Sequence, residues 1–419
     1  MTDAIIIGAG TAGLMAAREL TRAGKSVIVL EASARVGGRI FTVHDPLSGM
    51  PIELGAEFVH GEAKETTRLL DEARLATLNV SGKHHRFVNG RIEPLGSAWK
   101  RMALVFKHMS KRRKIDRSFQ EFLDERPGGA ALREERALAR GFVEGFEAAD
   151  TTLISEKSLV QQGDPTEGAM EARRIVGGYG ALVDYLARDI ARDIRVNTAA
   201  HRIEETANGV RVTDRLGGQW SGACVIVAVP LTSLQDDSLV ITPEADAMRR
   251  AARQLIMGHA KRVSVVLKER FWEEKVDELS YLHTAHGRFS VYWTQHPVSV
   301  PLLTAWAGGP SALELSRAGD VEGIMLAELA RAFGVRRARV DAMVESVHMH
   351  DWTRDVHTRG AYSYVGVGGL TAPKRLARAL SANVFMAGEA GEPDAGGTVE
   401  AAIRSGKRAA RQVLRGLSR

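Results

Sequence analysis

The sequence predicts an α/β protein of two domains, one with a parallel sheet and a second, α+β domain in which helices flank a mixed sheet. Two segments near opposite ends of the chain predict the first domain. Residues 3–13 read DAIIIGAGTAG, an apolar strand that runs into a glycine-rich turn. Residues 384–406 read VFMAGEAGEPDAGGTVEAAIRSG, a second strand, glycine-rich loop and helix start. Because both segments have a nucleotide-binding pattern, we expect the two ends to build one site.

The first glycine-rich segment has the pattern of a Rossmann-type turn. Residues 4–7 form a short apolar run, as expected of a buried parallel strand. Gly8 permits the tight turn, Gly10 lets the backbone approach a diphosphate, and Gly13 lets the next helix pack against the strand. The N–H groups and the dipole of that helix, expected over about residues 11–22, favour a phosphate at its N-terminus.

A carboxylate stands at the end of the next predicted strand. The run VIVL at 27–30 predicts this strand, and Glu31 follows it, 18 residues after Gly13. At this place a carboxylate accepts hydrogen bonds from ribose hydroxyls. It also repels a 2′-phosphate, which disfavours NADP. The strand, helix, strand and acid together predict a dinucleotide site.

The residues that follow Glu31 favour FAD over NAD as the bound dinucleotide. Residues 35–39 read RVGGR, and two arginines beside a glycine pair can add charge-assisted bonds to a diphosphate. A basic surface loop is the alternative interpretation. Residues 53–61 read ELGAEFVHG and add another tight glycine turn. NAD dehydrogenases share the first fingerprint but lack the C-terminal segment.

Here the chain resembles the flavin-containing amine oxidase superfamily, and within it the polyamine oxidases and the flavin-dependent histone demethylases. The resemblance recurs in the family's order along most of the chain. It implies a Rossmann-type FAD-binding domain of the amine oxidase and glutathione reductase kind. The matching stretches are residues 177–187, 195–203, 224–234, 257–272, 352–368, 387–389 and 396–410.

The resemblance also implies how FAD is bound. In the family's monoamine oxidases a cysteine before a conserved cage tyrosine attaches the flavin. Ala361 holds that place here, and the single cysteine, Cys224, lies in a distant apolar strand, so we expect non-covalent binding. The implied FAD-binding residues are Gly8, Gly10, Thr11, Ala12, Gly13, Glu31, Ala32, Arg35, Gly37, Gly38, Arg39, Gly55, Ala56, Glu57, Ala200, Gly388, Glu389, Gly397, Thr398 and Val399.

The same matches predict how the domains divide the chain. Residues 1–75, 170–240 and 345–419 are expected to form a discontinuous FAD-binding domain. Residues 76–169 and 241–344 are expected to form the substrate-binding domain, which contains most of the poorly matched sequence. The runs RVSVVLK, FSVYW and PLLTAWAGG predict strands there, which we expect to pair as an antiparallel sheet flanked by helices.

Three positions implied by the resemblance define an aromatic cage that is open on one side. Tyr362, in GAYSY, matches one wall, where an aromatic ring holds a neutral amine and attracts a cationic one. Thr398 stands where monoamine oxidases place a second tyrosine. His60, in EFVHG, matches a histidine of some polyamine oxidases that could bond a substrate amine. The alternative interpretations are a core tyrosine and a loop histidine.

The family's lysine, which bonds a water near flavin N5, is replaced in this chain. That lysine lies four residues after a glycine and ten before a tryptophan. Counting from Gly258 and from Trp272 gives Arg262 in both cases, and Lys261 is its neighbour. Because side chains alternate along a strand, only one of the two can face the flavin, and both counts favour Arg262. The arginine leaves open whether the enzyme is an efficient oxidase or a dehydrogenase.

The resemblance implies a FAD-dependent amine oxidase. Its chemistry would be hydride transfer from the carbon next to nitrogen of a primary or secondary amine to flavin N5, imine hydrolysis, and reoxidation by O2 to H2O2. Glu144, Glu147 and Asp150 are candidates for binding a cationic amine, with Glu147 and Asp150 expected on one helical face. A solvated helix edge is the alternative interpretation of these acids.

Other functions stay open. A carbon–carbon desaturase or dehydrogenase, or a protoporphyrinogen-oxidase-like enzyme, would share both FAD-binding ends. An L-amino-acid oxidase is disfavoured, because the family's amino-acid branch carries a carboxylate-binding arginine where this chain has residues 57–60. A histone demethylase role would need chromatin contacts that no separate domain in this sequence supplies. A flavin-binding protein without turnover is the non-enzymatic alternative.

Composition excludes several partners. The net charge of +6 is mild, and the basic stretch 99–114 has the apolar periodicity of a solvated helix, so we expect no nucleic acid partner. No apolar run has the length of a membrane span, and the first strand begins too early for a signal peptide, so we expect a cytoplasmic protein.

His348 and His350 share a strand face without a third ligand, so no metal site is expected. His84 and His85 are expected in a solvated loop. The expected partners are a small-molecule amine and O2, with a homodimer left open.

Overall fold

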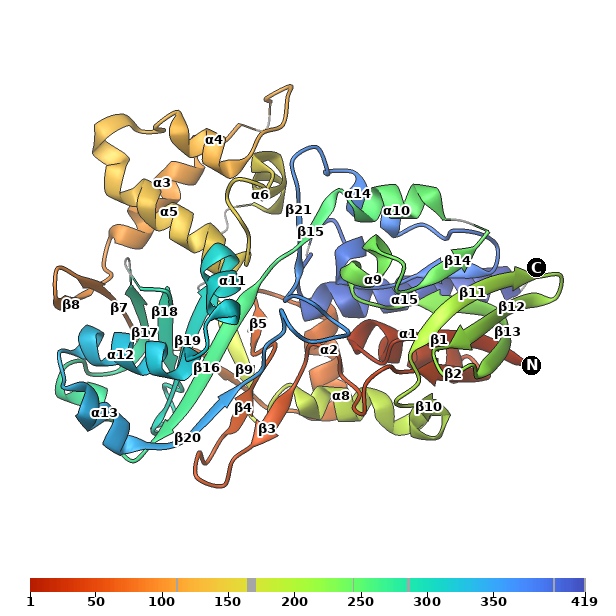
Figure 1. Ribbon diagram of the computed structural model, residues 1–419, viewed down its shortest axis with the longest axis horizontal. Helices are drawn as coiled ribbons and strands as arrows, with labels where there is room; N and C mark the ends of the chain where they lie inside the picture. The colour runs from red at the N-terminus through yellow and green to blue at the C-terminus, as the bar shows by residue number, and fades with distance from the viewer. Residues whose placement is uncertain (111, 164–170, 244, 285–286, 395, 418–419) are drawn as a thin grey trace.

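A mixed sheet joins the two ends of the chain (Figure 1). The computed structural model describes residues 1–110, 112–163, 171–243, 245–284, 287–394 and 396–417. In this first sheet, β1 pairs in parallel with β2 and β13, and β13 pairs in parallel with β22, so one strand separates the N-terminal from the C-terminal glycine segment. Its strands are β1 (Thr2–Ile7), β2 (Val27–Leu30), β10 (Ile194–Arg195), β11 (Ala200–Thr206), β12 (Gly209–Asp214), β13 (Gln219–Val227), β14 (Val240–Thr242) and β22 (Val384–Met386).

Helices cover both faces of the first sheet, because alternate residues of β1 enter two different cores. Ala4 and Ile6 pack with α1 (Thr11–Arg22), α15 (Val399–Leu417) and α8 (Gly180–Ala187). Ile5 and Ile7 pack with α9 (Leu231–Gln235), α10 (Asp246–Ala252) and α14 (Ala372–Leu376). Helices α1 and α15 lie very close, since a Cβ at Gly406 would lie 2.3 Å from the Ala12 carbonyl oxygen. The apolar run at residues 4–7 therefore belongs to a fully buried strand, as predicted.

A second sheet confirms the predicted antiparallel strands. Strands β16, β19, β18 and β17 pair antiparallel in that order, β20 pairs antiparallel with β16, and β7 joins β17 in parallel. Strand β20 lies in this sheet, although the predicted division at residue 345 assigned it to the FAD-binding part. The strands are β7 (Lys83–Val88), β8 (Arg91–Pro94), β16 (Ala260–Leu267), β17 (Leu279–Thr284), β18 (Val291–Thr294), β19 (Leu302–Gly308) and β20 (Val344–Met349).

The second sheet is covered on one face by a compact helical layer. Val263, Val265 and Leu303 point into a core with Met325 and Leu329 of α12. The helices on this side are α11 (Gly309–Arg317), α12 (Val321–Phe333) and α13 (Arg337–Met343). The opposite face looks toward the glycine-rich turns and carries the side chains considered below.

A small helical lobe lies above the second sheet in Figure 1, with its own core around Phe106, Phe119 and Val143. It contains α3 (Ala98–Phe106), α4 (Phe119–Asp124), α5 (Arg133–Phe146) and α6 (Glu156–Gln162). The remaining elements are helix α2 (Lys64–Ala73), the strand pairs β3–β4 and β15–β21, and a small three-stranded sheet in the order β5-β9-β6. These strands are β3 (Thr42–His44), β4 (Pro51–Glu53), β5 (Phe58–His60), β6 (Thr77–Asn79), β9 (Ala172–Ile175), β15 (Leu255–Met257) and β21 (Ser363–Val365).

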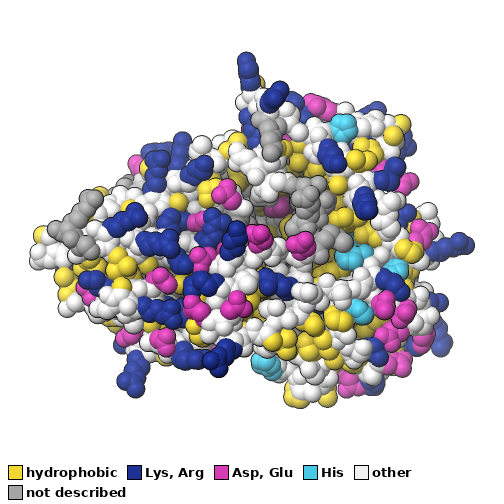
Figure 2. Space-filling view, turned by 180° about the vertical axis from the view of Figure 1, so that it is seen from behind, with side chains coloured by type: hydrophobic (Ala, Val, Ile, Leu, Met, Phe, Trp, Pro, Cys, Tyr) yellow, Lys and Arg dark blue, Asp and Glu magenta, His cyan; other side chains and the backbone are white. Residues whose placement is uncertain are grey.

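The surface carries both signs of charge. On the face drawn in Figure 2, Lys and Arg side chains are spread out with Asp and Glu side chains between them, in keeping with 57 basic and 51 acidic residues in the chain. Within the described ranges, every helix is too short or too polar to span a lipid bilayer.

Candidate active site

The turn after β1 leaves open space at the N-terminus of α1. Gly8 has a φ of +100°, and a Cβ there would lie 2.6 Å from the Ala228 carbonyl oxygen. A Cβ at Gly13 would lie 1.9 Å from the Gly8 carbonyl oxygen, so both positions require glycine. A Cβ at Gly10 would meet no described atom within 4 Å, and no side chain caps this end of α1. Backbone N–H groups that face open space at a helix N-terminus fit a diphosphate.

Glu31 holds the glycine turn in place. One carboxylate oxygen accepts the Ala9 backbone N–H at 2.7 Å, and the other accepts the backbone N–H and hydroxyl of Ser33, both at 2.8 Å. The Thr198 N–H donates to the Glu31 carbonyl, which places the segment leading to Ala200 beside this residue. The geometry gives Glu31 a role in ordering the turn, and its bond to a ribose and the contact of Ala200 with an adenine remain predictions.

Replacing Glu31 with Gln is expected to weaken FAD binding by about 1–2 kcal/mol, because charge-assisted bonds to the turn and to the ribose are lost together. Flavin retention on dilution of the variant would measure the effect. Unchanged occupancy would contradict a role for Glu31 at the nucleotide.

The RVGGR loop lies over the first turn. The Gly37 N–H donates to the Ala9 carbonyl at 2.8 Å, and Gly38 sits over the Cα of Gly10. Arg35 donates to the carbonyls of Gly38 and Ile40, at 2.7 and 2.9 Å. Burial lowers the pKa of the Arg35 guanidinium. Arg35 thus stabilises the shape of its own loop, and a direct bond to the diphosphate remains a prediction.

Arg39 connects the N-terminal loop to the C-terminal segment. It donates to the Glu389 carboxylate at 2.8 Å and to the Ala361 carbonyl at 2.9 Å. Glu389 also accepts the Ser363 hydroxyl at 2.6 Å and the Gly397 N–H at 3.0 Å. Burial would raise the pKa of Glu389, but Arg39 and these donors hold it below its ordinary value. The predicted FAD segments are therefore joined by a partly buried ion pair.

The candidate cage lies against the C-terminal glycine loop. A Cβ at Gly397 would lie 3.0 Å from Cδ2 of Tyr362, so glycine lets the tyrosine ring lie close to this backbone. The Thr398 hydroxyl accepts the Ala401 N–H at 3.0 Å and caps α15, while Val399 begins the helix. The Tyr362 hydroxyl donates to the Phe146 carbonyl at 2.7 Å, which joins the cage to the end of α5. Burial raises the pKa of Tyr362.

A buried charge cluster surrounds Glu57. Its carboxylate accepts from Arg262 and, at 2.5 Å, from Arg174 of β9, and the Trp293 indole N–H donates to it at 3.1 Å. Arg262 also donates to the Gly55 carbonyl at 3.2 Å. Burial would raise the pKa of Glu57, but the two guanidiniums hold it below its ordinary value. The predicted FAD-binding residue Glu57 thus fixes the predicted catalytic residue Arg262.

A small cavity adjoins this cluster. Its lining includes Glu53, Glu57, Arg174, Arg262 and Thr304. Burial raises the pKa of Glu53 to about 7, although the Thr42 hydroxyl and the Tyr179 N–H both donate to it. The cavity is polar, with two permanent cations and one permanent anion at its wall.

Lys261 and Arg262 point to opposite faces of β16. The strand pairs with β19 from Ala260 to Val266 without a shift, so no bulge turns Lys261 toward Arg262. The Lys261 ammonium lies 2.7 Å from Asp351, which also accepts from Ser316 of α11. Of the two predicted candidates, Arg262 lies on the face of β16 that contacts Gly55 and Glu57, and Lys261 lies on the opposite face.

The acidic candidates are arranged differently from the expectation. Helix α5 ends at Phe146 and Ala148 has a φ of +50°, so the prediction that Glu147 and Asp150 share a helical face is wrong. Asp150 accepts from the backbone and hydroxyl of Thr152. The Glu147 backbone N–H donates to the Val143 carbonyl at 3.0 Å, but its carboxylate makes no hydrogen bond or ion pair with any described residue, and burial raises its pKa to about 7. Burial likewise raises the pKa of Glu144.

Several histidines also differ from the expectation. His84 and His85 lie in strand β7 and not in a solvated loop, because β7 pairs with β17 and β8. His60 lies in β5 with its ring 5.4 Å from that of Phe146, near the cage. His348 and His350 bond Asp45 and Asp355, respectively. Among the described residues, no three His, Cys, Asp or Glu side chains gather as metal ligands would.

The sequence analysis did not identify Arg174 and Trp293 as the hydrogen-bond partners of Glu57. Arg174 and Trp293 bond Glu57 from positions 117 and 236 residues away along the chain. The alternation in FSVYW places Trp293 on one face of a strand, but it does not say what lies opposite.

Comparison with known proteins identifies the family. The family model "Flavin containing amine oxidoreductase" matches residues 11–414. Polyamine oxidase 4 of Oryza sativa subsp. japonica is 27% identical over 97% of this chain and 87% of its own length. Lysine-specific histone demethylase 1 homolog 2 of the same organism is 27% identical over 98% of this chain and 56% of its own length, so the chain spans little more than half of that relative. A structure of putrescine oxidase bound to putrescine aligns over 99% of both chains, with a TM-score of 0.84 and 21% identity, which shows the shared fold.

The chain belongs to the flavin-containing amine oxidoreductases. The open turn at Gly10 fits the diphosphate of a dinucleotide flavin cofactor.

Proposed function

We propose that the protein oxidises the C–N bond of a small primary or secondary amine. The placement of Tyr362 carries this proposal: its ring lies on Gly397 of the C-terminal glycine loop, and its hydroxyl holds the end of α5, where Glu147 follows. An aromatic face beside an unpaired carboxylate suits a group that arrives as an ammonium and reacts as a neutral amine.

FAD, when bound, supplies the hydride acceptor and passes the electrons to O2. The chain's own residues would bind and orient the amine. Glu147 would attract the ammonium, Tyr362 would direct the C–H bond, and His60 would contact the substrate from β5. Arg262, held by Glu57, would place a fixed positive charge beside the reacting centre.

Glu147→Gln is expected to raise the Kd of the amine several-fold while leaving the rate of flavin reduction at saturation nearly unchanged, because Glu147 attracts the substrate without taking part in hydride transfer. Because the pKa of Glu147 is about 7, the wild-type carboxylate is charged at pH 8 and largely neutral at pH 6. The loss should therefore be larger at pH 8. Anaerobic stopped-flow titration at both pH values measures it.

Asp150→Asn is the matched control, since that carboxylate already accepts from Thr152. An equal change in both variants would argue that general negative charge, and not Glu147, attracts the amine.

FAD is expected to be bound non-covalently. Ala361 precedes Tyr362, and Cys224 is buried in β13, away from the glycine turns. Acid precipitation should release all the yellow colour into the supernatant, and colour retained in the pellet would contradict this expectation.

A screen for H2O2 over amines, polyamines and amino acids, with flavin bleaching recorded anaerobically, tests the proposed function. Amine-dependent bleaching with H2O2 supports an oxidase, and bleaching with slow H2O2 release supports a dehydrogenase. A desaturase would show no amine-dependent H2O2. Flavin that stays oxidised with every amine would overturn the proposal.

A further inference from the structure

The small cavity beside Glu57 has unused hydrogen-bond donors at its wall. Arg174 and Arg262 both line it, and both side chains are almost fully buried. Arg174 donates from Nε to Glu57 and from Nη2 to the Thr294 carbonyl. Arg262 donates from Nη2 to Glu57 and from Nη1 to the Gly55 carbonyl. This leaves Arg174 Nη1 and Arg262 Nε, which have no partner among the residues that the structure describes.

A pair of hydroxyl groups adds a further donor. Ser264 of β16 and Thr304 of β19 are paired across the sheet, fully buried, and both line the cavity. Their oxygens lie 2.9 Å apart, so one hydroxyl hydrogen serves the bond between them. The second hydroxyl hydrogen has no other acceptor in the described part of the chain. A hydroxyl and two guanidinium groups can therefore donate to the same space.

The carboxylates at the wall are already engaged as acceptors. Glu57 accepts from both guanidiniums and from the Trp293 indole. Glu53 accepts the Thr42 hydroxyl at one oxygen and the Tyr179 N–H at the other. A water molecule in the cavity has to donate as well as accept, whereas an anion only accepts. The wall therefore suits an anion better than it suits water.

The charge of the wall also favours an anion. Arg174 and Arg262 contribute two positive charges and Glu57 contributes one negative charge, and Glu53 is the remaining ionisable group of the lining. Burial raises the pKa of Glu53 to about 7, although the Arg262 guanidinium favours its charged form. Below pH 7 the wall thus carries one positive charge in excess, because Glu53 is then mostly neutral. A buried charge without a counter-charge is unfavourable, and a monovalent anion would balance it.

Size and surroundings limit the occupant to a small ion. The space inside is about that of a water molecule. Much of the remaining wall is apolar and comes from Met50, Ile52, Ile175 and Leu302. Because these side chains exclude bulk water, the attraction between an anion and the guanidiniums is only weakly screened. Sulfate and phosphate are too large for this space, and chloride is the common anion closest to it in size.

We propose that this cavity binds a small monovalent anion, such as chloride, between Arg174, Arg262 and the Ser264–Thr304 hydroxyl pair. Glu57 balances one of the two guanidiniums, and the anion would balance the other. The proposal concerns a site other than the amine position at Tyr362, and it does not depend on which substrate is oxidised.

Thermal unfolding of the holoenzyme, with FAD in excess, measures the affinity for chloride. Sodium chloride replaces sodium gluconate at constant ionic strength, so that general screening by salt stays unchanged. The rise of the unfolding midpoint with chloride concentration gives an apparent Kd, since a ligand that binds only the folded state stabilises it. We expect a rise that saturates. A midpoint that does not respond, or that rises linearly without saturation, overturns the proposal.

A variant at Glu57 tests the proposal with an effect of opposite sign. Glu57→Gln removes the negative charge from the wall and keeps both guanidiniums, so chloride should bind it about tenfold more tightly than it binds the wild type. The same substitution at the solvated Glu65 should leave the Kd unchanged. An unchanged Kd in Glu57→Gln, or an equal gain in both variants, overturns the assignment to this cavity.

Removing donors from the wall should have the reverse effect. Arg262→Met is expected to weaken chloride binding by about tenfold or more, and Thr304→Val, which keeps the shape of the side chain, by several-fold. Lys261→Met is the matched control, because it removes a cation from the opposite face of β16. Equal losses in the Lys261 and Arg262 variants, or wild-type affinity in both Arg262→Met and Thr304→Val, contradict binding at this wall.

Glu53 should make chloride binding depend on pH. Because its pKa is about 7, its carboxylate gains a negative charge between pH 6 and pH 8, and the wall loses its excess of positive charge. The apparent Kd for chloride should therefore be about tenfold higher at pH 8 than at pH 6. Glu53→Gln stays neutral and should keep the low Kd at both pH values. A Kd that rises equally in this variant contradicts the role of Glu53.

A crystal of the holoenzyme soaked in sodium bromide locates the ion. Anomalous scattering from bromide is expected within hydrogen-bond distance of the Arg174 and Arg262 guanidiniums. Water in the cavity, with bromide only at the surface of the molecule, overturns the proposal. Bromide in the cavity without any response to chloride in solution means binding at crystal concentration only, and overturns it as well.

Discussion

Glu57→Gln is expected to lower the free energy of unfolding by about 3–5 kcal/mol, because it leaves two buried guanidiniums without a counter-charge. The side chains of Glu57, Arg262 and Arg174 are only 4%, 4% and 7% exposed. Gln can still accept a hydrogen bond, but it cannot balance either cation. Urea denaturation of the flavin-free variant against the flavin-free wild type measures the change.

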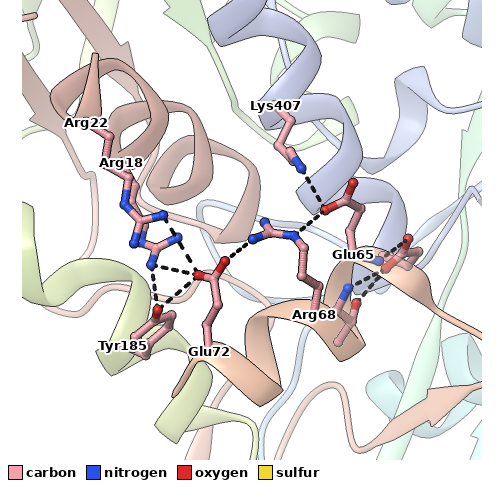
Figure 3. Close-up of polar contacts among 9 residues, drawn as sticks. Arg18, Arg22, Glu65, Arg68, Glu72, Tyr185 and Lys407 are labelled. Atoms are coloured by element: carbon pink, nitrogen blue, oxygen red, sulfur yellow. Dashed lines mark hydrogen bonds and ion pairs between the residues drawn. The ribbon is translucent and has the colours of Figure 1, made fainter. Parts of the chain in front are cut away.

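Glu65→Gln is the control for this prediction. In Figure 3, Glu65 lies between Arg68 and Lys407, in a network that links α2 to α15. Its side chain is 28% exposed, so solvent screens the charges and we expect a loss below about 1 kcal/mol. If the Glu57 and Glu65 variants lose the same free energy of unfolding, solvent screens the charges around Glu57 as it does those around Glu65, and the argument from burial is wrong.

A double variant tests whether the loss of stability in Glu57→Gln comes from unbalanced charge. Glu57→Met combined with Arg262→Met removes a cation together with the anion, and should recover part of the stability lost in Glu57→Gln. No recovery would mean that Glu57 stabilises the fold through its hydrogen bonds to Arg174 and Trp293 and not through charge balance.

Features of the fold set by neighbouring residues could be predicted from the sequence. The apolar run at 4–7, the turn at Gly8 and the helix after Gly10 depend on contacts within a short stretch. The structure has this strand and this helix where they are predicted, and the family match confirms the flavin-containing class. The predicted roles of individual residues in FAD binding stay predictions, although the structure gathers their segments around one pair of glycine loops.

The partners of the site could not be predicted, because periodicity reports which face a residue occupies and not what lies opposite. Arg174 reaches Glu57 only because β9 pairs with β5. The end of α5 also had no strong signal, since Glu147 continues the amphipathic pattern and only the positive φ of Ala148 breaks the helix.

Arg262 stands where the family resemblance places a lysine, and we expect its replacement to have a large effect on reoxidation of the flavin by O2. Arg262 is charged at every accessible pH and is held by Glu57 and by the Gly55 carbonyl. Its Nε is buried and has no partner among the described residues. A fixed cation with a spare donor can hold a water or stabilise negative charge that develops when O2 is reduced.

Arg262→Met is therefore expected to slow reoxidation of the reduced enzyme by about tenfold to a hundredfold, whereas Lys261→Met should change it by less than about twofold. Lys261 pairs with Asp351 on the other face of β16, so its removal affects packing and not the reacting centre. Stopped-flow mixing of each reduced variant with O2 measures both rates, and Arg262→Lys should retain part of the wild-type rate because it keeps the charge. If only the Lys261 variant is slow, the register of β16 at this point is wrong. If neither is slow, reoxidation does not depend on a cation from this strand.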